Sequence, residues 1–311
     1  VDSSWYFFRH IDSKNSNKIF EKERANYWLP TDLYMIGAEH IVLHLLYARF
    51  FTKFFFDEGI INFDEPFMKM RHMGIIAGPD GRKMSKRWGN VINPNDEIQK
   101  YSADTVRMYE MFMGPLADPK PWNDRSENGV FRFLNKVWDV GMRHASSNEE
   151  MKELKNEEIK SQQRLINKLI KRISEDTEVL SFNTAIARFM EFINAISTFE
   201  KIDKSVWETF IKVLAPYAPF ITEELWEKLG NTYSIHLQKW PEFDPELIKD
   251  DVITMGVQIN GKVRGTIQIS PEAEEKDAME LAKADEKISK NIIGEPKKVI
   301  YIKGKILNII I

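Results

Sequence analysis

The sequence of 311 residues contains no cysteine, which excludes disulfide bonds and thiolate metal sites. It also lacks a run of about 18 apolar residues, the length typical of a membrane-spanning helix. Its start has no basic region followed by an apolar leader. The six histidines show no paired metal-ligand motif, so we expect no metal site among the side chains. These absences predict a cytoplasmic protein that does not contact a membrane.

The charge is nearly balanced, so the chain as a whole is not a basic nucleic-acid binder. Forty-four Lys and Arg residues stand against 47 Asp and Glu residues, a net charge of −3. Any contact with RNA must therefore come from local clusters of basic side chains. The hydrophobic content of 43% is enough for large cores, and the length predicts two or three domains.

Three patterns follow one another along the chain. In residues 1–115, apolar runs alternate with a helical pattern at 39–58, which predicts an α/β, Rossmann-like layer. Residues 116–250 show helical periodicity and predict an all-α bundle, whose last helix is broken near Pro216 and Pro219.

Residues 251–311 combine alternating apolar positions with an acidic helical stretch at 272–293. This combination predicts a small α+β domain in which two hairpins surround one helix. Asn260-Gly261 between the first two strands is a strong hairpin signal, because both residues tolerate positive φ.

A dense basic cluster follows a glycine turn in residues 80–90, which we call the signature loop. Lysine ammonium groups there can follow the charge that builds on a phosphorus under attack and on the departing pyrophosphate. A serine hydroxyl between them can donate a hydrogen bond to a phosphate oxygen. From the residues alone, two interpretations of this cluster stay open. One is a solvated run of surface charge, and the other is a loop that binds a polyphosphate.

Residues 83–87 read lysine-methionine-serine-lysine-arginine and are similar to the lysine-methionine-serine-lysine-serine motif of class I aminoacyl-tRNA synthetases. The resemblance implies a loop that closes over ATP and stabilises the transition state of amino-acid activation. It makes Lys83, Ser85 and Lys86 candidate catalytic residues, with Lys83 and Lys86 also binding ATP. Arg87 stands where the family has serine, which puts a contact by residue 87 in doubt.

Gly37, Glu39 and His40, followed by His44, resemble the class I segment at a strand end that opens a helix, where open parallel sheets bind nucleotides. Gly37 lets a ribose approach the backbone, and Glu39 can accept hydrogen bonds from ribose hydroxyls. By spacing alone, the two histidines could be core residues, surface residues or metal ligands, although no carboxylate or cysteine completes a ligand set. The resemblance assigns His40 and His44 to the amino-acid pocket.

The first nine residues, VDSSWYFFR, resemble the segment of leucyl-tRNA synthetases that follows the editing insertion and lines the leucine pocket. The resemblance implies that Ser3 and Tyr6 contact leucine. Without it, a Trp-Tyr-Phe-Phe run is more often core packing. The segment favours a leucyl enzyme over a valyl, isoleucyl or methionyl one.

Two further stretches are similar to the RNA-binding parts of these enzymes. Residues 214–226 resemble a scaffold segment of the anticodon-binding bundle shared by the leucyl, isoleucyl, valyl and methionyl families. Residues 257–265 resemble the hairpin that opens the leucyl C-terminal domain, which contacts the tRNA elbow. Lys262 and Arg264 are therefore candidate tRNA-binding residues, able to meet phosphates or stack on bases. Taken alone, this hairpin would be an ordinary surface turn.

The resemblance spans essentially all 311 residues, yet the histidine-isoleucine-glycine-histidine motif and an editing domain are not among them. We expect a piece of a leucine–tRNA ligase that is inactive alone and works with a complementary N-terminal half, covalent or as a subunit. The implied reaction converts leucine and ATP, accompanied by Mg²⁺, to leucyl-adenylate and then transfers leucine to tRNA(Leu). The alternative is a non-catalytic tRNA-binding module derived from a class I synthetase. The intact basic loop argues against that alternative.

Overall fold

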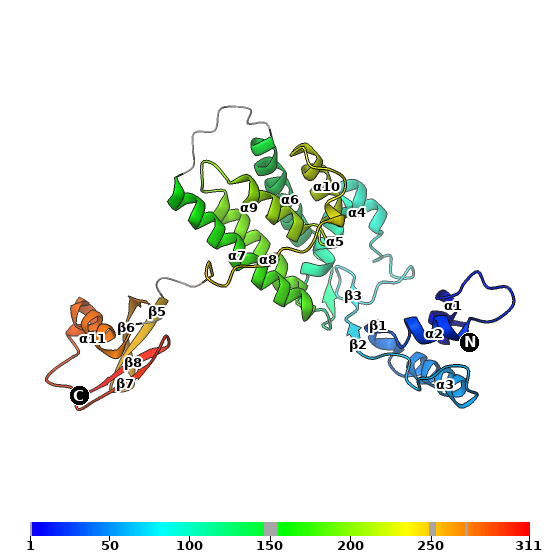
Figure 1. Ribbon diagram of the computed structural model, residues 1–311, viewed down its shortest axis with the longest axis horizontal. Helices are drawn as coiled ribbons and strands as arrows, with labels where there is room; N and C mark the ends of the chain where they lie inside the picture. Colours follow the sequence, from blue (N-terminus) through cyan, green and yellow to red (C-terminus); the bar gives the residue numbers. More distant parts are fainter. Residues whose placement is uncertain (1, 146–154, 249–252, 271–272) are drawn as a thin grey trace. The chain divides into compact units, whose positions relative to one another are not determined.

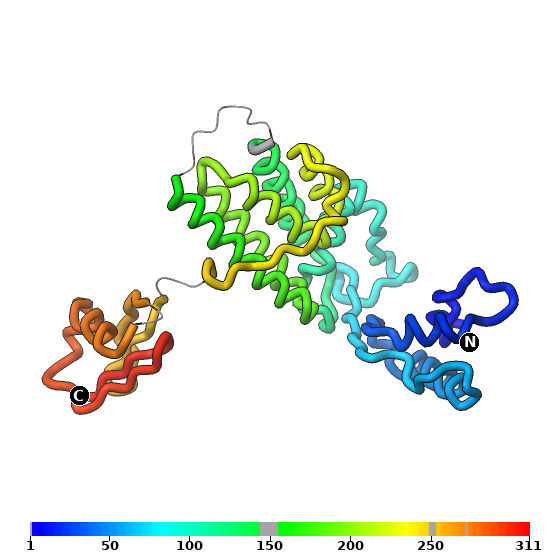
Figure 2. Tube along the Cα trace, viewed as in Figure 1, coloured from blue at the N-terminus to red at the C-terminus, as the bar shows by residue number. Residues whose placement is uncertain are grey.

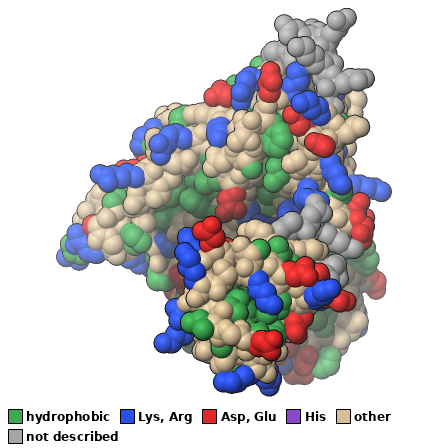
Figure 3. All heavy atoms as spheres, turned by 90° about the vertical axis from the view of Figure 1, so that its left-hand side faces the viewer, with side chains coloured by type: hydrophobic (Ala, Val, Ile, Leu, Met, Phe, Trp, Pro, Cys, Tyr) green, Lys and Arg blue, Asp and Glu red, His purple; other side chains and the backbone are tan. Residues whose placement is uncertain are grey.

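The computed structural model describes residues 2–145, 155–248, 253–270 and 273–311 (Figures 1 and 2). It divides into two compact units, Val1–Phe243 and Asp244–Ile311. No helix within the described ranges is both long enough and apolar enough to cross a membrane. On the face drawn in Figure 3, Lys and Arg side chains are interspersed with Asp and Glu side chains, in keeping with the balanced composition.

The first helices of the larger unit share a core built largely from phenylalanine side chains. Phe8 and Phe20 stack with ring centroids 5.3 Å apart, and Phe55 meets both rings edge-on. The helical pattern expected at 39–58 is split into a 3-10 turn and an α-helix. The break falls at the β-branched pair 41–42, whose stiff side chains lower helix propensity. The elements are η1 (Asp2–Ser4), α1 (Tyr6–His10), α2 (Lys22–Trp28), η2 (Ala38–His40) and α3 (Leu43–Asp57).

Four short strands of this unit pair in parallel, β1 with β2 and β3 with β4. Parallel strands among helices agree with the α/β pattern of the sequence, but each sheet has two strands in the described residues. The complete Rossmann-like layer therefore stays a prediction. A Cβ atom on Gly74, between β2 and β3, would lie 1.9 Å from the carbonyl oxygen of Asp118, so only glycine fits there. The strands are β1 (Tyr34–Gly37), β2 (Met70–Met73), β3 (Ile76–Ala77) and β4 (Lys120–Pro121).

Helices dominate the rest of the larger unit and enclose one continuous core, in which Phe189 and Trp207 are almost fully buried. The break expected near the two prolines is confirmed, because α9 ends at Leu214 and α10 begins at Pro219. The elements are α4 (Pro94–Lys100), α5 (Ala103–Phe112), α6 (Asp124–Ala145), α7 (Asn156–Glu178), α8 (Phe182–Ile196), α9 (Lys204–Leu214), α10 (Pro219–Lys228) and η3 (Ile235–Leu237).

Asp104 of α5 ties this helix to the start of α10. Its buried carboxylate accepts hydrogen bonds from the backbone N–H groups of Phe220 at 3.3 Å and Ile221 at 2.7 Å. Burial raises the pKa of the Asp104 carboxyl, and the two hydrogen bonds oppose this shift. Because the N-cap of α10 is Ala218, which has no capping side chain, Asp104 supplies the cap from another helix.

We expect Asp104→Ala to lower the free energy of unfolding of the larger unit by about 2 kcal/mol, since two N–H groups lose a buried acceptor. Urea unfolding followed by tryptophan fluorescence measures this unit alone, because all eight tryptophans precede Phe243. Asp104→Asn keeps one acceptor oxygen and should lose less. Equal losses in the two variants would contradict the capping role.

The second unit is a four-stranded sheet in the order β6-β5-β8-β7, with two short helices packed against it. The predicted Asn260-Gly261 turn is confirmed, with φ of 50° and 78°. The sequence suggested one helix at 272–293. Residue 272 lies outside the described residues, and within 273–293 there are two helices, because Asp285 ends the first and its side chain caps the second. The elements are β5 (Ile253–Ile259), β6 (Lys262–Ile269), α11 (Glu275–Ala284), α12 (Glu286–Ser289), β7 (Lys298–Ile302) and β8 (Ile306–Ile310).

Candidate active site

The four residues predicted to bind the amino acid lie around one cavity of about 360 Å³ in the larger unit. They come from η1, α1, η2 and α3, so the pocket forms where the chain's first turn meets the segment after β1. Five further residues complete the wall, and the sequence analysis singled out none of them. The lining residues are Ser3, Ser4, Tyr6, Tyr34, Ile36, His40, Leu43, His44 and Tyr47.

A chain of hydrogen bonds crosses this pocket. The hydroxyls of Tyr6 and Tyr34 are 3.1 Å apart, and the Tyr34 hydroxyl lies 2.7 Å from Nε2 of His44. Burial, and then the neighbouring His40, lower the pKa of His44, which favours its neutral ring. Burial also raises the pKa of Tyr34, so its hydroxyl keeps the proton. The pocket therefore presents uncharged polar groups beside apolar walls.

Tyr34 lines the pocket, but no pattern in the sequence identified it. It lies in the short apolar run that became β1, where nothing distinguishes it from a core residue. Its ring stacks on Phe67 with centroids 3.7 Å apart and nearly parallel planes, which fixes the position of its hydroxyl. Residues that meet across such sequence distances give no local signal of their contact.

The predicted ribose-binding segment adjoins the signature loop. The Nζ atom of Lys83 lies 4.0 Å from Oε1 of Glu39. Both side chains are well exposed, so this ion pair contributes little to stability and leaves the lysine able to move to a ligand. A Cβ atom on Gly37 would lie 2.8 Å from Oε2 of Glu39, so a larger residue would displace that carboxylate.

Asn90 and Asp80 close the signature loop at its base. Asn90 Oδ1 accepts a hydrogen bond from the backbone N–H of Ser85 at 2.9 Å, and its Nδ2 donates to Oδ1 of Asp80 at 3.0 Å. Asp80 also accepts from the backbone and the side chain of Arg82. These bonds lower the pKa of Asp80, the one from Asn90 having the largest effect. The clasp keeps the loop formed while its lysines stay exposed.

The centre of the loop rests on the helical bundle. Met84 packs against the bundle core, whereas Lys83 and Lys86 on either side are exposed. The Ser85 hydroxyl oxygen accepts a hydrogen bond from the backbone N–H of Arg87 at 3.2 Å. The Arg87 guanidinium lies over the ring of Trp88, 5.2 Å from its centroid. One half-buried side chain thus holds the loop while its cations face solvent.

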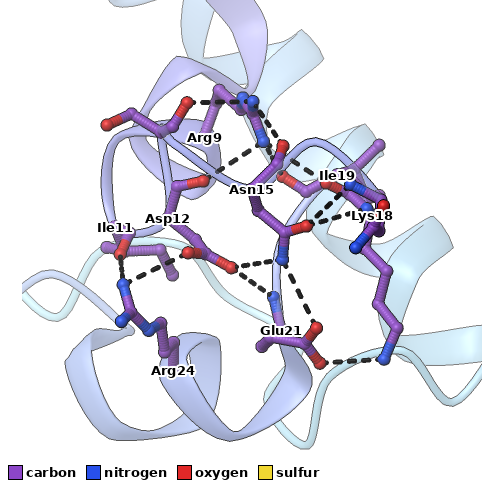
Figure 4. Close-up of polar contacts among 10 residues, drawn as sticks. Arg9, Ile11, Asp12, Asn15, Lys18, Ile19, Glu21 and Arg24 are labelled. Atoms are coloured by element: carbon purple, nitrogen blue, oxygen red, sulfur yellow. Dashed lines mark hydrogen bonds and ion pairs between the residues drawn. The ribbon is translucent and has the colours of Figure 1, made fainter.

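A polar network not foreseen from the sequence holds α1, which carries Tyr6, in place (Figure 4). The Arg9 guanidinium donates hydrogen bonds to five backbone carbonyls in the connection to α2. Asp12 accepts hydrogen bonds from Asn15 and from the backbone of Glu21, and the bond from Asn15 is the main cause of its lowered pKa. The network orders the connection without a helix or strand.

The remaining predicted residues, Lys262 and Arg264, lie in β6 of the second unit, and both are exposed. In the described part of the chain, no group of three or more His, Asp or Glu residues could hold a metal ion.

Family comparisons match two stretches of the chain. The model described as tRNA synthetases class I (I, L, M and V) matches residues 5–119. The model described as anticodon-binding domain of tRNA ligase matches residues 163–279.

Curated relatives cover almost the whole chain. A leucine–tRNA ligase of Leptospira biflexa is 44% identical over 310 residues, which are 99% of this chain and 36% of the relative. One from Borrelia garinii is 41% identical and is matched over 40% of its length. The chain thus spans less than half of the curated relatives it matches.

Solved structures of aminoacyl-tRNA synthetases also match this chain. A ternary LeuRS-tRNA-LeuAMS complex from Agrobacterium radiobacter K84 contains a chain that matches with a TM-score of 0.86 and 32% identity, over 99% of this chain and 42% of that one. A Mycobacterium tuberculosis methionyl-tRNA synthetase bound to methionyl-adenylate matches with a TM-score of 0.57 and 15% identity, which shows a shared fold alone.

Proposed function

Because this chain belongs to the class I leucyl-tRNA synthetases, as part of a leucine–tRNA ligase, we propose that it contributes to ATP-dependent leucine activation and to transfer of leucine to tRNA(Leu). One observation carries the proposal. The pocket lined by Ser3, Tyr6, His40 and His44 adjoins Glu39, and Glu39 pairs with Lys83 of the signature loop. An amino acid and a nucleotide bound at these places would meet.

In this proposal, leucine lies in the cavity of about 360 Å³, with its side chain against Ile36 and Leu43. The neutral His44 ring and the fixed Tyr34 hydroxyl suit an apolar amino acid better than a charged one, because neither brings a net charge. Ser3 and His40 are the polar groups at the rim that we assign to leucine as well.

We assign the nucleotide to the neighbouring segment. The Glu39 carboxylate would accept hydrogen bonds from the ribose hydroxyls, beside the bare backbone of Gly37. Lys83 and Lys86 would neutralise the charge that develops as leucine attacks the α-phosphate and pyrophosphate leaves, with Ser85 donating to a phosphate oxygen. Mg²⁺ would enter as the partner of the substrate ATP. We assign this reaction to the cytoplasm as part of the same proposal.

We divide the chain for this reaction into a catalytic part at 1–115, a tRNA-binding bundle at 116–250 and a tRNA-binding domain at 251–311. The family model over 5–119 supports the first part, and the model over 163–279 covers most of the second and continues past 250 into the third. Lys262 and Arg264 would contact tRNA from the third.

Helix α3 has an exposed apolar surface that the complementary N-terminal half of the enzyme would cover. Leu46, Phe50 and Phe54 follow one another at intervals of four residues on this helix and are 60%, 64% and 48% exposed. Residues at that spacing lie on one face and make a continuous apolar stripe. We propose that the rest of the catalytic fold covers it.

The test is leucine-dependent ATP–pyrophosphate exchange, measured for this chain alone and mixed with the complementary half of a related leucine–tRNA ligase. We expect exchange only in the mixture. Phe50→Asp should abolish it by placing a charge in the covered stripe, whereas Lys14→Asp, a charge change on an exposed loop, should not. Binding of tRNA(Leu) without exchange in any mixture would favour the alternative, a non-catalytic tRNA-binding module.

A further inference from the structure

The signature loop has two limbs, residues 80–82 and 88–90, which lie side by side and are joined at their base by the Asn90–Asp80 hydrogen bond. Between them, the backbone N–H of Trp88 donates a hydrogen bond to the carbonyl of Ser85 at 3.0 Å, which reverses the direction of the chain. We call residues 83–87, which this reversal places between the limbs, the tip of the loop. The tip carries the two lysines assigned to the reaction.

A cation–π contact joins the two limbs a second time. The Arg82 guanidinium lies over the ring of Trp88, 4.9 Å from its centroid. Asp80 orients this guanidinium, because its Oδ2 accepts a hydrogen bond from Nε of Arg82 at 2.8 Å. Asp80 is itself held by Asn90. The limbs are therefore connected at their base and again at the indole ring.

Arg82 and Lys83 are adjacent in the chain but have different partners. The Nζ atom of Lys83 lies 4.0 Å from the Glu39 carboxylate, in the segment assigned to the nucleotide. Residue 83 forms an antiparallel bridge with β3, so the backbone is extended there and successive side chains point to opposite sides. The contact between Arg82 and Trp88 thus occupies the side of the loop away from Glu39.

Trp88 does not contribute to the hydrophobic cores formed by the described residues, and its side chain is 53% exposed. Its ring contacts two guanidinium groups, those of Arg82 and Arg87. Arg87 is its neighbour in the chain, so that contact joins no separate parts of the loop. Arg82 is on the opposite limb. A cation over an exposed ring favours the joined arrangement by about two- to fivefold.

We propose that Trp88 is a positioning residue for leucine activation. By holding Arg82 it keeps the limbs together, and so keeps Lys83 and Lys86 in place before the reaction begins. Charges that stabilise a transition state act most strongly when they are already positioned. When the limbs separate, the same lysines are in place for a smaller fraction of the time, so kcat falls while ATP binding changes little. The inference rests on the proposed function and deepens it.

The experiment measures leucine-dependent ATP–pyrophosphate exchange in the whole ligase, meaning this chain joined to the remainder of the enzyme. Trp88→Leu removes the ring but keeps an apolar side chain, and Arg82→Gln removes the cation. Each should lower kcat about fivefold, with less than about a twofold change in the KM for ATP. The double variant should also lose about fivefold, rather than the roughly 25-fold of independent effects, because both changes break one contact.

Two further variants distinguish this contact from a general effect of altering the loop. Trp88→Phe keeps an aromatic face for Arg82 and should restore kcat to within about twofold of the unmodified ligase. Arg87→Gln removes the other guanidinium from the same ring without separating the limbs, and should also stay within about twofold. A residue that merely stabilised the fold would show neither the rescue by phenylalanine nor the coupling to Arg82.

Multiplicative losses in the double variant would overturn the inference, as would a loss in Trp88→Phe as large as that in Trp88→Leu. An equal loss in Arg87→Gln and Arg82→Gln would overturn it too, because joining the limbs would then not matter. A raised KM for ATP at unchanged kcat would show that Trp88 contacts the nucleotide instead. An unmodified ligase without leucine-dependent exchange would reject the proposed function itself.

Discussion

Lys86→Ala in the whole ligase should lower the rate of leucine-dependent ATP–pyrophosphate exchange by about 10²- to 10³-fold, the usual effect of removing one preorganised charge from a transition state. Met84 packs the loop against the bundle core, and the hydrogen bond between Asn90 and Asp80 closes its base. The substitution touches neither support, so the loop should keep its form and lose only an ammonium group. Because that group stabilises charge present mainly in the transition state, kcat should fall more than the KM for ATP rises.

Arg87→Ala is the matched control for this prediction. It removes the same charge from the next residue, whose guanidinium lies over Trp88. We expect less than about a threefold change in exchange rate, as for a cation that does not contact the phosphates. Similar losses in the two variants would mean that the loop acts through its overall charge, and the assignment of Lys86 would be wrong.

Glu127→Gln should make the stability of the larger unit much less dependent on pH. Glu127 is fully buried in the first turn of α6, and burial, reinforced by the facing Glu97 carboxyl, raises its pKa to about 7. An unfolded glutamate titrates near its ordinary value of 4.5. Between these two pH values the folded protein holds a proton that the unfolded chain has released. The stabilisation is therefore complete at low pH and is lost as pH rises towards 7, by up to about 3 kcal/mol.

The measurement is urea unfolding at pH 5 and pH 8, followed by tryptophan fluorescence. The unmodified chain should be less stable at pH 8, and Glu127→Gln should remove most of that difference because glutamine cannot ionise. Glu157→Gln is the control, since Glu157 is also in the first turn of a helix but is exposed. A pH dependence unchanged by Glu127→Gln would show that Glu127 does not hold the proton.

Local signals in the sequence predicted much of this protein. Helical periodicity predicted a helical region at 116–250, and the two prolines marked the break between α9 and α10. Asn260-Gly261 marked its turn because positive φ is a property of those residue types. The split of the acidic stretch into α11 and α12 was missed, since the capping role of Asp285 depends on the chain turning there.

The candidate site was predicted only in part, because local sequence signals do not report contacts between distant elements. Ser3, Tyr6, His40 and His44 were identified by resemblance, and the structure brings them to one cavity. Tyr34 was missed, because its role depends on a hydrogen bond to His44, which lies ten positions away in another element. No periodicity or composition reports such a contact.

The sequence by itself determined that residues 116–250 are largely helical, where the proline break and the Asn260-Gly261 turn fall, and that the signature loop carries exposed lysines, because these depend on neighbouring residues. Only the tertiary structure decided that Asp104 caps α10 and that Glu127 meets Glu97. It also decided that a β-bulge in β6 leaves Arg264 without a residue opposite it and turns Val263 away from the core of the second unit. Each of these depends on elements distant in the chain packing together, and burial and strand register exist only once they have done so.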